Sequence, residues 1–479
     1  MFGINNFKKI SEWVWELPSN FRADMEVPAR VYASEKMLED IFRDESIPQL
    51  VNTATLPGLV KYALVMPDAH EGYGFPIGGV AAIRASDGVI SPGGIGFDQN
   101  CGVRVLLSDY QAAELKPYLE KLADKIQKEV PSGLGKGRQV KLSIEQIDKI
   151  LEGGSKHLVE QGYGEAGDIE YCESNGCMRQ AQAAVVSDKA KMRGRDQVGT
   201  LGSGNHFLEV QKVEEIFDEK VAQTFGLFAG QAVVMVHTGS RGLGHQNCTD
   251  YLQLLDKAAS QYGIKIPDRE LACVPFSSPE GQRFFSAMAA GANYAWANRQ
   301  MITHHIRKAW QTVFSKGNLS LLYDVAHNIA KVETHEVDGQ KMELVVHRKG
   351  ATRALPAGHP EIPTKHKQVG QPVLIPGSMG TASYILVGSK GGRESWYSTA
   401  HGAGRTMSRH AAIKSISGQQ IVKDLQALGI VVKCHNLRGI AEEAPQAYKN
   451  IDEVVEVVHK AGLSRRVAKL VPLAVIKGE

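Results

Sequence analysis

Short apolar runs bounded by glycine or polar loops recur along the whole chain, and this pattern limits the possible folds more than any other feature. Such runs are typical of strands, which we expect at residues 62–66, 80–83, 103–107, 232–237, 320–325, 342–346, 372–375, 384–387 and 470–476. Helical periodicity separates them and predicts helices at residues 112–130, 144–161, 281–314 and 452–460. The alternation predicts a mixed α/β protein of the α+β class.

No clear domain boundary is visible in the pattern. The chain has 479 residues, more than one hydrophobic core usually supports, yet it shows no fixed-period repeat and no low-complexity linker. We therefore expect residues 1–479 to form a single large, interwoven catalytic domain. Residues 131–177 join a stretch rich in glycine, lysine and arginine to an acidic stretch, and we expect a surface excursion there.

The charge balance excludes a polycationic nucleic-acid binder. A formal net charge of +3 is nearly neutral for this length, and 43% hydrophobic with 22% charged residues is ordinary for a globular protein. Any contact with RNA must therefore come from a local patch of the surface.

The cysteines and the N-terminus indicate the cellular setting. Six cysteines are sparse and irregularly spaced, which disfavours a secreted disulfide scaffold and favours a reducing cytoplasm. Cys172 and Cys177 are interpreted as incidental, because no other obvious ligands accompany them. No signal-peptide core and no apolar run of the roughly 18 residues that a membrane helix requires are present, so we expect a cytoplasmic protein without a membrane partner.

Five potential metal ligands stand where apolar runs meet glycine or polar loops. Asp98 and Cys101 are three residues apart in a glycine-rich loop, and a thiolate can bridge two ions. His206, His237 and His327 could complete two open sites at strand ends. Taken singly, a buried histidine is more often a hydrogen-bonded core residue, and a buried cysteine a small hydrophobe. The carboxylate favours manganese and the thiolate favours zinc, which leaves the metal open on chemistry alone.

Three glycine-rich loops could approach an anion through their backbone N–H groups. They lie at residues 202–206, 376–381 and 401–404. None is a Walker sequence, and residues 133–137 lack the spacing of one, so a flexible surface turn is expected there. With 49 glycines in the chain, some of these loops could equally be structural.

Four further residues are candidates for contacts with phosphate or an RNA end. Arg241 and Arg405 could each bind phosphate in a bidentate manner, with a surface salt bridge as the alternative. His70 could bind a substrate phosphate. Asp68 could orient a ligand or the RNA end, and an Asx turn is its alternative role.

Seven of the chain's motifs, taken together and in order, resemble the RtcB family of RNA-splicing ligases. They are MPDAHEGYGFPIGG, GGIGFDQNCGVR, GSGNHFLEV, VHTGSRGLG, YDVAHN, PGSMGTASY and STAHGAGR, followed by VIKG near the C-terminus. The resemblance covers the chain from about residue 60 to its end, and no departure falls at a position that would carry chemistry.

The resemblance implies a GTP- and manganese-dependent ligase for RNA repair and tRNA splicing. Such an enzyme joins an RNA 3′-phosphate or 2′,3′-cyclic phosphate to a 5′-hydroxyl. His401 would attack the α-phosphorus of GTP to form a guanylyl-histidine, and GMP would then pass to the RNA as an RNA-(3′)pp(5′)G end. Archease is implied as a possible activating partner.

The resemblance also assigns ligands. One manganese ion would be held by Asp98, Cys101 and His206, and a second by Cys101, His237 and His327. The implied nucleotide contacts are Asn205, His206, Phe207, Leu208, Glu209, His327, Asn328, Pro376, Gly377, Ser378, Met379, Ser383, His401, Gly402, Ala403, Gly404 and Lys477.

Other functions remain as alternatives. A metal-dependent phosphohydrolase could use the same ligands to activate water, and a non-catalytic RNA-binding component of a processing complex would need no turnover. Neither requires a nucleotide-accepting histidine or Lys477. The KxDG motif of lysine-dependent ligases is absent, so a ligase of this sequence would depend on His401.

Overall fold

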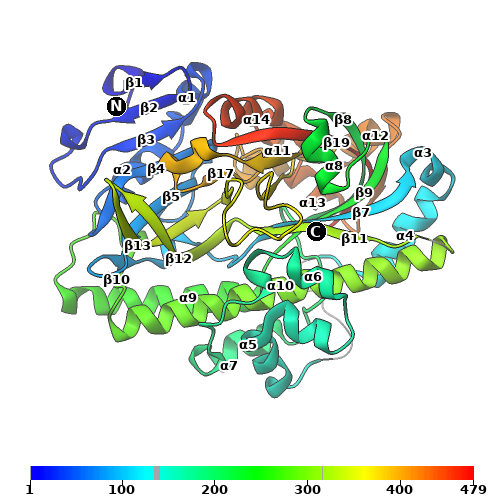
Figure 1. The fold of residues 1–479 in the computed structure, drawn as a ribbon, viewed down its shortest axis with the longest axis horizontal. Coiled ribbons are helices and arrows are strands. Elements are labelled where there is room, and N and C mark those ends of the chain that lie inside the picture. Colours follow the sequence, from blue (N-terminus) through cyan, green and yellow to red (C-terminus); the bar gives the residue numbers. More distant parts are fainter. Residues whose placement is uncertain (1, 134–140, 316, 479) are drawn as a thin grey trace.

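The structure is a computed structural model that describes residues 2–133, 141–315 and 317–478. Its first sheet lies at the left of Figure 1 and has seven strands in the order β1-β2-β3-β4-β5-β13-β12. Neighbouring strands are antiparallel except β3 and β4. The strands are β1 (Lys8–Ser11), β2 (Val14–Leu17), β3 (Ala29–Tyr32), β4 (Leu59–His70), β5 (Ile77–Arg84), β12 (Asn328–Val337) and β13 (Gln340–Lys349).

A second, eight-stranded sheet supplies most of the strand ends that carry candidate ligands. Seven of its strands follow the order β11-β7-β9-β8-β19-β16-β15, and β18 pairs in parallel with β19. Its interior strand β9 is buried along its whole length, which explains the uninterrupted apolar run in its sequence. The strands are β7 (Gly102–Gln111), β8 (Phe207–Ile216), β9 (Gln231–Thr238), β11 (Ser320–Ala326), β15 (Pro372–Ile375), β16 (Ser383–Gly388), β18 (Val431–Lys433) and β19 (Ser464–Lys477).

Two small two-stranded sheets complete the strand pairing among the described residues. They pair β6 (Val89–Ile90) with β10 (Val274–Pro275) and β14 (Ala351–Arg353) with β17 (Ser398–Ala400). The second pair connects the end of β13 to the loop that carries His401.

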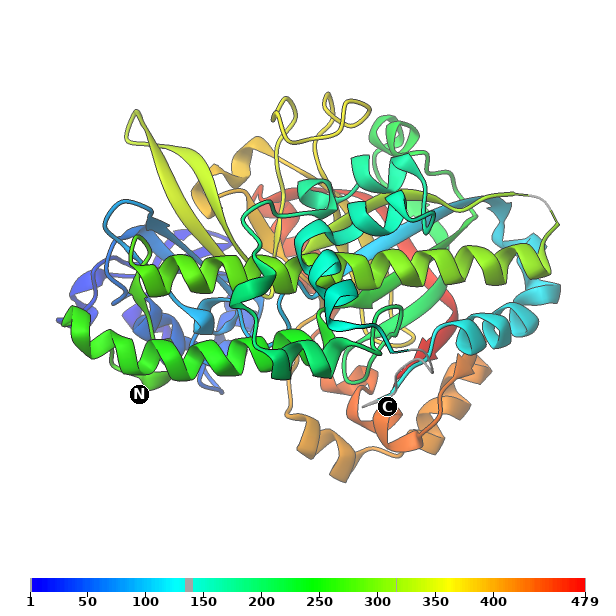
Figure 2. The same cartoon turned by 90° about the horizontal axis from the view of Figure 1, so that it is seen from below.

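The longest helix, α10 (Pro279–Val313), runs beneath the sheets beside α9 (Arg241–Ala259) (Figures 1 and 2). Ser278 caps the N-terminus of α10, because its side chain accepts a hydrogen bond from the Gly281 N–H. Pro279 follows as the first residue of the helix. The other α-helices are α1 (Glu35–Ile41), α2 (Ser46–Thr53), α3 (Ala112–Leu115), α4 (Leu119–Glu129), α5 (Ile144–Glu160), α6 (Ala166–Glu170), α7 (Asp188–Gly194), α8 (Glu219–Phe225), α11 (Arg409–Ser415), α12 (Gly418–Ala427), α13 (Leu437–Glu442) and α14 (Ile451–Lys460).

Helix α10 takes part in two hydrophobic cores. Trp296 is buried in a core that α10 shares with α5 and α9. Trp310 is buried in another core, which α10 shares with α4 and the second sheet. One helix therefore packs against both the helical layer and the strands that lead to the site. None of the helices in the described ranges combines the length and the apolar character needed to cross a membrane.

The predicted α+β class is confirmed, with corrections to individual elements. The helix predicted at residues 112–130 is wrong as one element, because it is divided into α3, a 3₁₀ turn that contains Pro117, and α4. The sequence analysis missed β1, β2 and β3. It also missed β8 and β12, in which charged residues alternate with apolar ones and so leave no continuous apolar run.

The stretch predicted as a surface excursion, residues 131–177, is buried in part. Residues 134–140 of it lie outside the described residues. Cys172 is 2% exposed and Glu173 is 0% exposed. The buried Glu173 carboxylate accepts hydrogen bonds from the Lys331 ammonium at 2.6 Å and from the Ala326 N–H at 2.8 Å. Glu173 thus contacts β11 and β12, while Glu165 and Glu170 of the same acidic stretch are exposed.

Candidate active site

The pairing of β11, β7, β9 and β8 brings four candidate ligands to one edge of the second sheet. In this sheet Gly102 pairs with both Thr238 and Ala326, and Phe207 pairs with His237. Each strand end lies next to a candidate ligand or includes one. Residues more than two hundred positions apart in the sequence therefore become neighbours.

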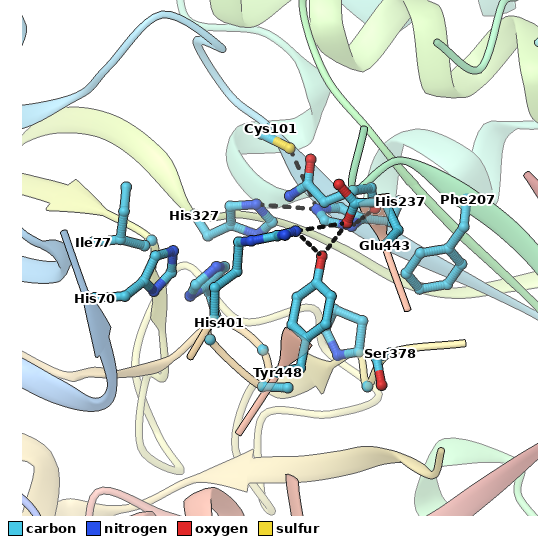
Figure 3. A pocket seen from close by; sticks show the side chains of 18 of the residues that line it. His70, Ile77, Cys101, Phe207, His237, His327, Ser378, His401, Glu443 and Tyr448 are labelled. Carbon is cyan, nitrogen blue, oxygen red and sulfur yellow. Dashed lines mark hydrogen bonds and ion pairs between the residues drawn. The ribbon is translucent and has the colours of Figure 1, made fainter. Parts of the chain in front are cut away.

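The candidate ligands form two groups of three that share Cys101, with the three ligand atoms of each group within 4.8 Å of one another. The first trio is Asp98, Cys101 and His206, and the second trio is Cys101, His237 and His327. Cys101 Sγ lies 3.5 Å from His206 Nε2 and 3.3 Å from His237 Nε2. His237 Nε2 lies 3.3 Å from His327 Nε2 (Figure 3). These side chains have little exposure, and Asp98 is the most exposed of them.

Hydrogen bonds orient two of the histidines toward Cys101. His206 Nδ1 lies 3.1 Å from the Leu201 carbonyl oxygen, and His237 Nδ1 lies 3.1 Å from the Asn205 carbonyl oxygen. A carbonyl accepts, so each Nδ1 carries a proton, and Nε2 of His237 keeps a lone pair. This is how imidazole rings are usually held when Nε2 binds a metal. Nε2 of His206 lies 2.8 Å from Asp98 Oδ2, to which it donates when no cation lies between them.

Burial favours the neutral form of the three ligands of the second trio. It raises the pKa of the Cys101 thiol well above its usual value and lowers those of His237 and His327 well below theirs. Burial also acts to raise the pKa of Asp98, but the interaction with His206 outweighs it, and the Asp98 pKa is lowered. A divalent cation would reverse the shift of the thiol, because it favours thiolate.

His401 lies beside the second trio and is bonded to a buried carboxylate. Its ring centroid is 4.9 Å from that of His327. Asp68 Oδ2 lies 2.6 Å from His401 Nδ1 and also accepts hydrogen bonds from the N–H groups of His401 and Gly402. Asp68 is 0% exposed and lies in β4 of the first sheet. The site therefore forms where the two large sheets meet.

The Asp68 contact defines the tautomer of His401. Burial acts to raise the pKa of Asp68, yet its interaction with His401 holds that pKa below the usual value. The ionised carboxylate can only accept, so Nδ1 of His401 donates and its Nε2 keeps the lone pair. His70 Nδ1 in turn lies 2.9 Å from the Asp68 carbonyl oxygen.

A cavity opens over these histidines (Figure 3). Each of the three glycine-rich loops contributes residues to its walls. Of the residues singled out from the sequence, its walls include His70, Asp98, Cys101, Asn205, Phe207, His237, His327, Asn328, Pro376, Gly377, Ser378, Met379, His401, Gly402, Ala403, Gly404, Arg405 and Lys477. Asp68, His206, Leu208, Glu209, Arg241 and Ser383 lie outside this lining.

Two buried charged groups lie at the β8 and β19 side of the site. Burial raises the pKa of Glu209 to about 8 and lowers the pKa of Lys477 to about 8. Gln211 Nε2 donates to Glu209 Oε2 at 2.7 Å and to Ser383 Oγ at 3.1 Å. The carboxyl of Glu209 is therefore largely protonated at neutral pH and can donate a hydrogen bond.

Arg241 and Arg405 differ in their contacts. Arg241 begins α9 with a positive φ of 54° and donates from Nε to Thr200 Oγ1 at 3.1 Å. Arg405 lies on the cavity wall, where it forms an ion pair with Glu443 at 3.2 Å and donates to the Tyr448 hydroxyl at 3.1 Å. The salt-bridge alternative therefore applies to Arg405, while its side chain still faces the cavity.

Sequence reasoning missed five residues of the cavity wall, two of which, Ile77 and Gly350, lie at the start of β5 and just after β13. The other three are Arg409, Glu443 and Tyr448. Glu443 is 2% exposed, and its carboxylate accepts a hydrogen bond from the Tyr448 hydroxyl. No glycine-rich loop or apolar run marks Arg409, Glu443 and Tyr448 in the sequence, because only the packing of α11 and of the segment after it brings them over the site.

Comparison with known proteins gives consistent results. The family described as tRNA-splicing ligase RtcB matches residues 49–478. A tRNA-splicing ligase RtcB of Thermococcus kodakarensis is 54% identical over 476 residues, which cover 98% of both chains. One of Aeropyrum pernix is 52% identical and covers 98% of this chain and 99% of its own. An RNA-splicing ligase RtcB of Mycobacterium tuberculosis is 52% identical over 433 residues, 90% of this chain and all of its own.

Proposed function

The chain belongs to the RtcB family of tRNA-splicing ligases and is an RNA ligase, and from this premise we propose that it joins RNA ends by a GTP- and manganese-dependent route through His401. The substrates would be a 2′,3′-cyclic phosphate or 3′-phosphate end and a 5′-hydroxyl end, as in tRNA splicing and RNA repair. We place this activity in the cytoplasm, with archease as a candidate activator.

The two trios support the metal part of the proposal. A carboxylate, a thiolate and three imidazoles lie close enough to hold two divalent ions, one in each trio with Cys101 shared. When bound, two such ions neutralise phosphate charge and orient the attacking and leaving oxygens. The chain's own part is to direct Nε2 of His206 and of His237 toward the ions by holding each Nδ1 against a carbonyl oxygen.

The Asp68 contact with His401 is the observation that carries the proposal. Nδ1 donates to Asp68, so the Nε2 lone pair can attack the α-phosphorus of GTP. The new P–N bond forms as the bond from the α-phosphorus to the bridging oxygen breaks, and pyrophosphate leaves with the electron pair. Asp68 stabilises the positive charge that develops on the ring.

Transfer to RNA would take place by further displacements at phosphorus. Water opens a cyclic phosphate to a 3′-phosphate, whose oxygen attacks the guanylyl phosphorus and releases His401. The 5′-hydroxyl then attacks the 3′-phosphorus, loses its proton and expels GMP, which leaves a 3′,5′-phosphodiester. Neither exchange needs an oxidant or a second nucleotide.

The cavity walls support a nucleotide site beside His401. Backbone N–H groups of residues 376–379 and 402–404 could approach the phosphates. Glu209, Ser383 and Lys477 lie toward the β8 and β19 side, where a neutral carboxyl and an ammonium suit a purine and its ribose. Arg405 and His70 remain candidates for the RNA phosphates, and so does Arg241 beside His206.

Covalent labelling tests the proposal against its alternatives. Incubation with α-phosphate-labelled GTP and Mn²⁺ should leave an acid-labile, alkali-stable label on the protein, and a His401→Ala variant should carry none. His410, exposed on α11, provides the matched control, since His410→Ala should label normally. Phosphate release without protein labelling would favour the phosphohydrolase, and RNA binding without turnover the non-catalytic component.

A further inference from the structure

A single buried guanidinium connects all three chain segments that carry the second trio. Arg299 lies on α10 and is 0% exposed. It touches Asn100, which precedes Cys101, and Thr238, which follows His237. It also pairs with Asp324 on β11, three residues before His327.

All five N–H donors of Arg299 are used in these contacts. Nε and one N–H of Nη2 donate to the two oxygens of Asp324 at 2.9 and 2.8 Å. Nη1 donates to the carbonyl oxygens of Asn100 at 2.8 Å and Thr238 at 2.9 Å, and Nη2 also donates to Asn100 Oδ1 at 2.9 Å. A guanidinium has five donors in one rigid plane, so these distances fix the three segments relative to one another.

The first trio has different supports. Asp98 Oδ1 accepts hydrogen bonds from the N–H and the hydroxyl of Ser240, and His206 Nδ1 faces the Leu201 carbonyl oxygen. Arg299 donates to none of these groups directly, although Asn100 lies between Asp98 and Cys101 and the Thr238 hydroxyl donates to the same Leu201 carbonyl oxygen. Its direct hydrogen bonds go to the three segments of the second trio, so the larger effect should fall on that trio.

A second buried arginine shares the same carboxylate without these contacts. Arg104 is 0% exposed and donates from Nε to Asp324 Oδ2 at 2.7 Å. Its Nη1 donates to Gln300 and Thr303, both on α10, and so is directed away from the Asn100 and Thr238 segments. Arg104 is therefore a control for Arg299. Both arginines form a buried ion pair with Asp324, but only Arg299 also contacts the Asn100 and Thr238 segments.

We propose that Arg299 is a positioning residue that sets the spacing of Cys101, His237 and His327, and so allows the second ion to bind alongside the first. It touches neither substrate nor metal and acts through the backbone of the three segments. This inference rests on the two-ion site of the proposed function. Outer contacts of this kind commonly change metal affinity by roughly ten- to hundredfold.

Binding of Mn²⁺ alone, without GTP or RNA, tests the role. The free-Mn²⁺ signal in electron paramagnetic resonance, followed during a titration, gives the number of ions bound and their affinities. The unmodified chain and Arg104→Lys should each bind two Mn²⁺ ions. Arg299→Lys keeps the charge but has three donors in place of five, so its second ion should bind at least about tenfold more weakly.

A second variant removes one of the same contacts from the other side. Asn100 has a φ of 51°, which glycine adopts without strain, so Asn100→Gly keeps the loop conformation while it deletes the Oδ1 acceptor and, with it, the Nδ2 donor to the Ala292 carbonyl oxygen. It should also weaken the second ion, by less than Arg299→Lys. Circular dichroism and thermal unfolding establish that each variant is folded, and Asn100→Gly answers the question if Arg299→Lys does not fold.

The outcomes separate this inference from the proposed function. Equal weakening in Arg299→Lys and Arg104→Lys, or unchanged second-ion affinity in both Arg299→Lys and Asn100→Gly, would overturn the positioning role while leaving the two-ion site intact. Fewer than two ions on the unmodified chain would contradict the two-ion site itself, and this inference with it.

Discussion

At the scale of single residues, chemistry in this site depends on which nitrogen of each histidine carries a proton. The structure assigns these protons through acceptors: carbonyl oxygens for His206 and His237, and the Asp68 carboxylate for His401. Because carbonyls and carboxylates only accept, each Nδ1 donates, which directs Nε2 of His206 and His237 toward the metal site and leaves Nε2 of His401 with its lone pair. In the metal ligands and in the nucleophile alike, a hydrogen bond from Nδ1 orients the imidazole ring, and only the acceptor differs.

Replacing Asp68 by asparagine tests the role of the hydrogen bond that His401 Nδ1 donates to this carboxylate. Asp68→Asn preserves the side-chain shape but removes the charge that stabilises the developing positive ring, and it can invert the His401 tautomer. We expect the rate of guanylylation to fall on the order of a hundredfold or more, with Mn²⁺ binding unchanged. A single-turnover labelling time course measures the rate, and Asp87→Asn, at an exposed turn, is the control. An unchanged rate in Asp68→Asn would exclude the assigned role.

The protonation of Glu209 predicts a pH dependence of stability. Its pKa is raised from the ordinary 4.5 to about 8 in the folded chain by burial, so folding favours the protonated form. The stabilisation is complete below about pH 4.5 and is lost as pH rises through 8. Glu209→Gln is neutral throughout, so between about pH 5 and pH 8.5 the unmodified chain should lose a few kcal/mol more of its free energy of unfolding than the variant loses.

Thermal unfolding of both proteins at the two pH values measures this difference. Titrating groups that do not interact with Glu209 are common to the pair and cancel, whereas Lys477 is coupled to Glu209 and contributes to the difference. A difference that does not change with pH would mean that Glu209 is ionised in the folded chain.

At the scale of elements, the site depends on where strands end. β7, β8, β9 and β11 reach the same edge, and β19 adds Lys477 at its last position, paired with Phe207. A lysine this near a C-terminus would ordinarily be solvated, yet the sheet pairing leaves Lys477 only 3% exposed. Because β19 pairs with strands on both sides, Lys477 is part of the cavity wall.

Lys477→Met tests the contribution of this strand end to nucleotide binding. Methionine keeps an apolar side chain of similar length but removes the ammonium, which lies 5.8 Å from the centroid of the Phe207 ring. We expect the GTP concentration for half-maximal guanylylation to rise on the order of tenfold, because a buried charged contact is lost. Lys469→Met, on the same strand but paired with Asp452 away from the cavity, should leave it unchanged. Equal GTP dependence in both variants would remove Lys477 from the nucleotide site.

At the scale of the whole molecule, the sequence allowed the class of fold and most of the site to be predicted, but not how the parts meet. Apolar runs marked β7, β9 and β11, and glycine loops marked the cavity walls, since both signals are local. The contact between Asp68 of the first sheet and His401 joins residues 333 positions apart, and no local pattern reports it. The same holds for Glu443 and Tyr448, and for Arg299, which in the sequence is one charge within a helix.

Transfer from isolated guanylylated protein tests the central claim most directly. Protein labelled with GMP and freed of GTP would be mixed with Mn²⁺ and two RNA fragments, one ending in a 3′-phosphate and the other beginning with a 5′-hydroxyl. We predict that joined RNA appears, up to one molecule for each guanylylated chain, as the label leaves the protein as GMP. Label that stays on the protein while no RNA is joined, or equal joining by His401→Ala, would contradict ligation through His401.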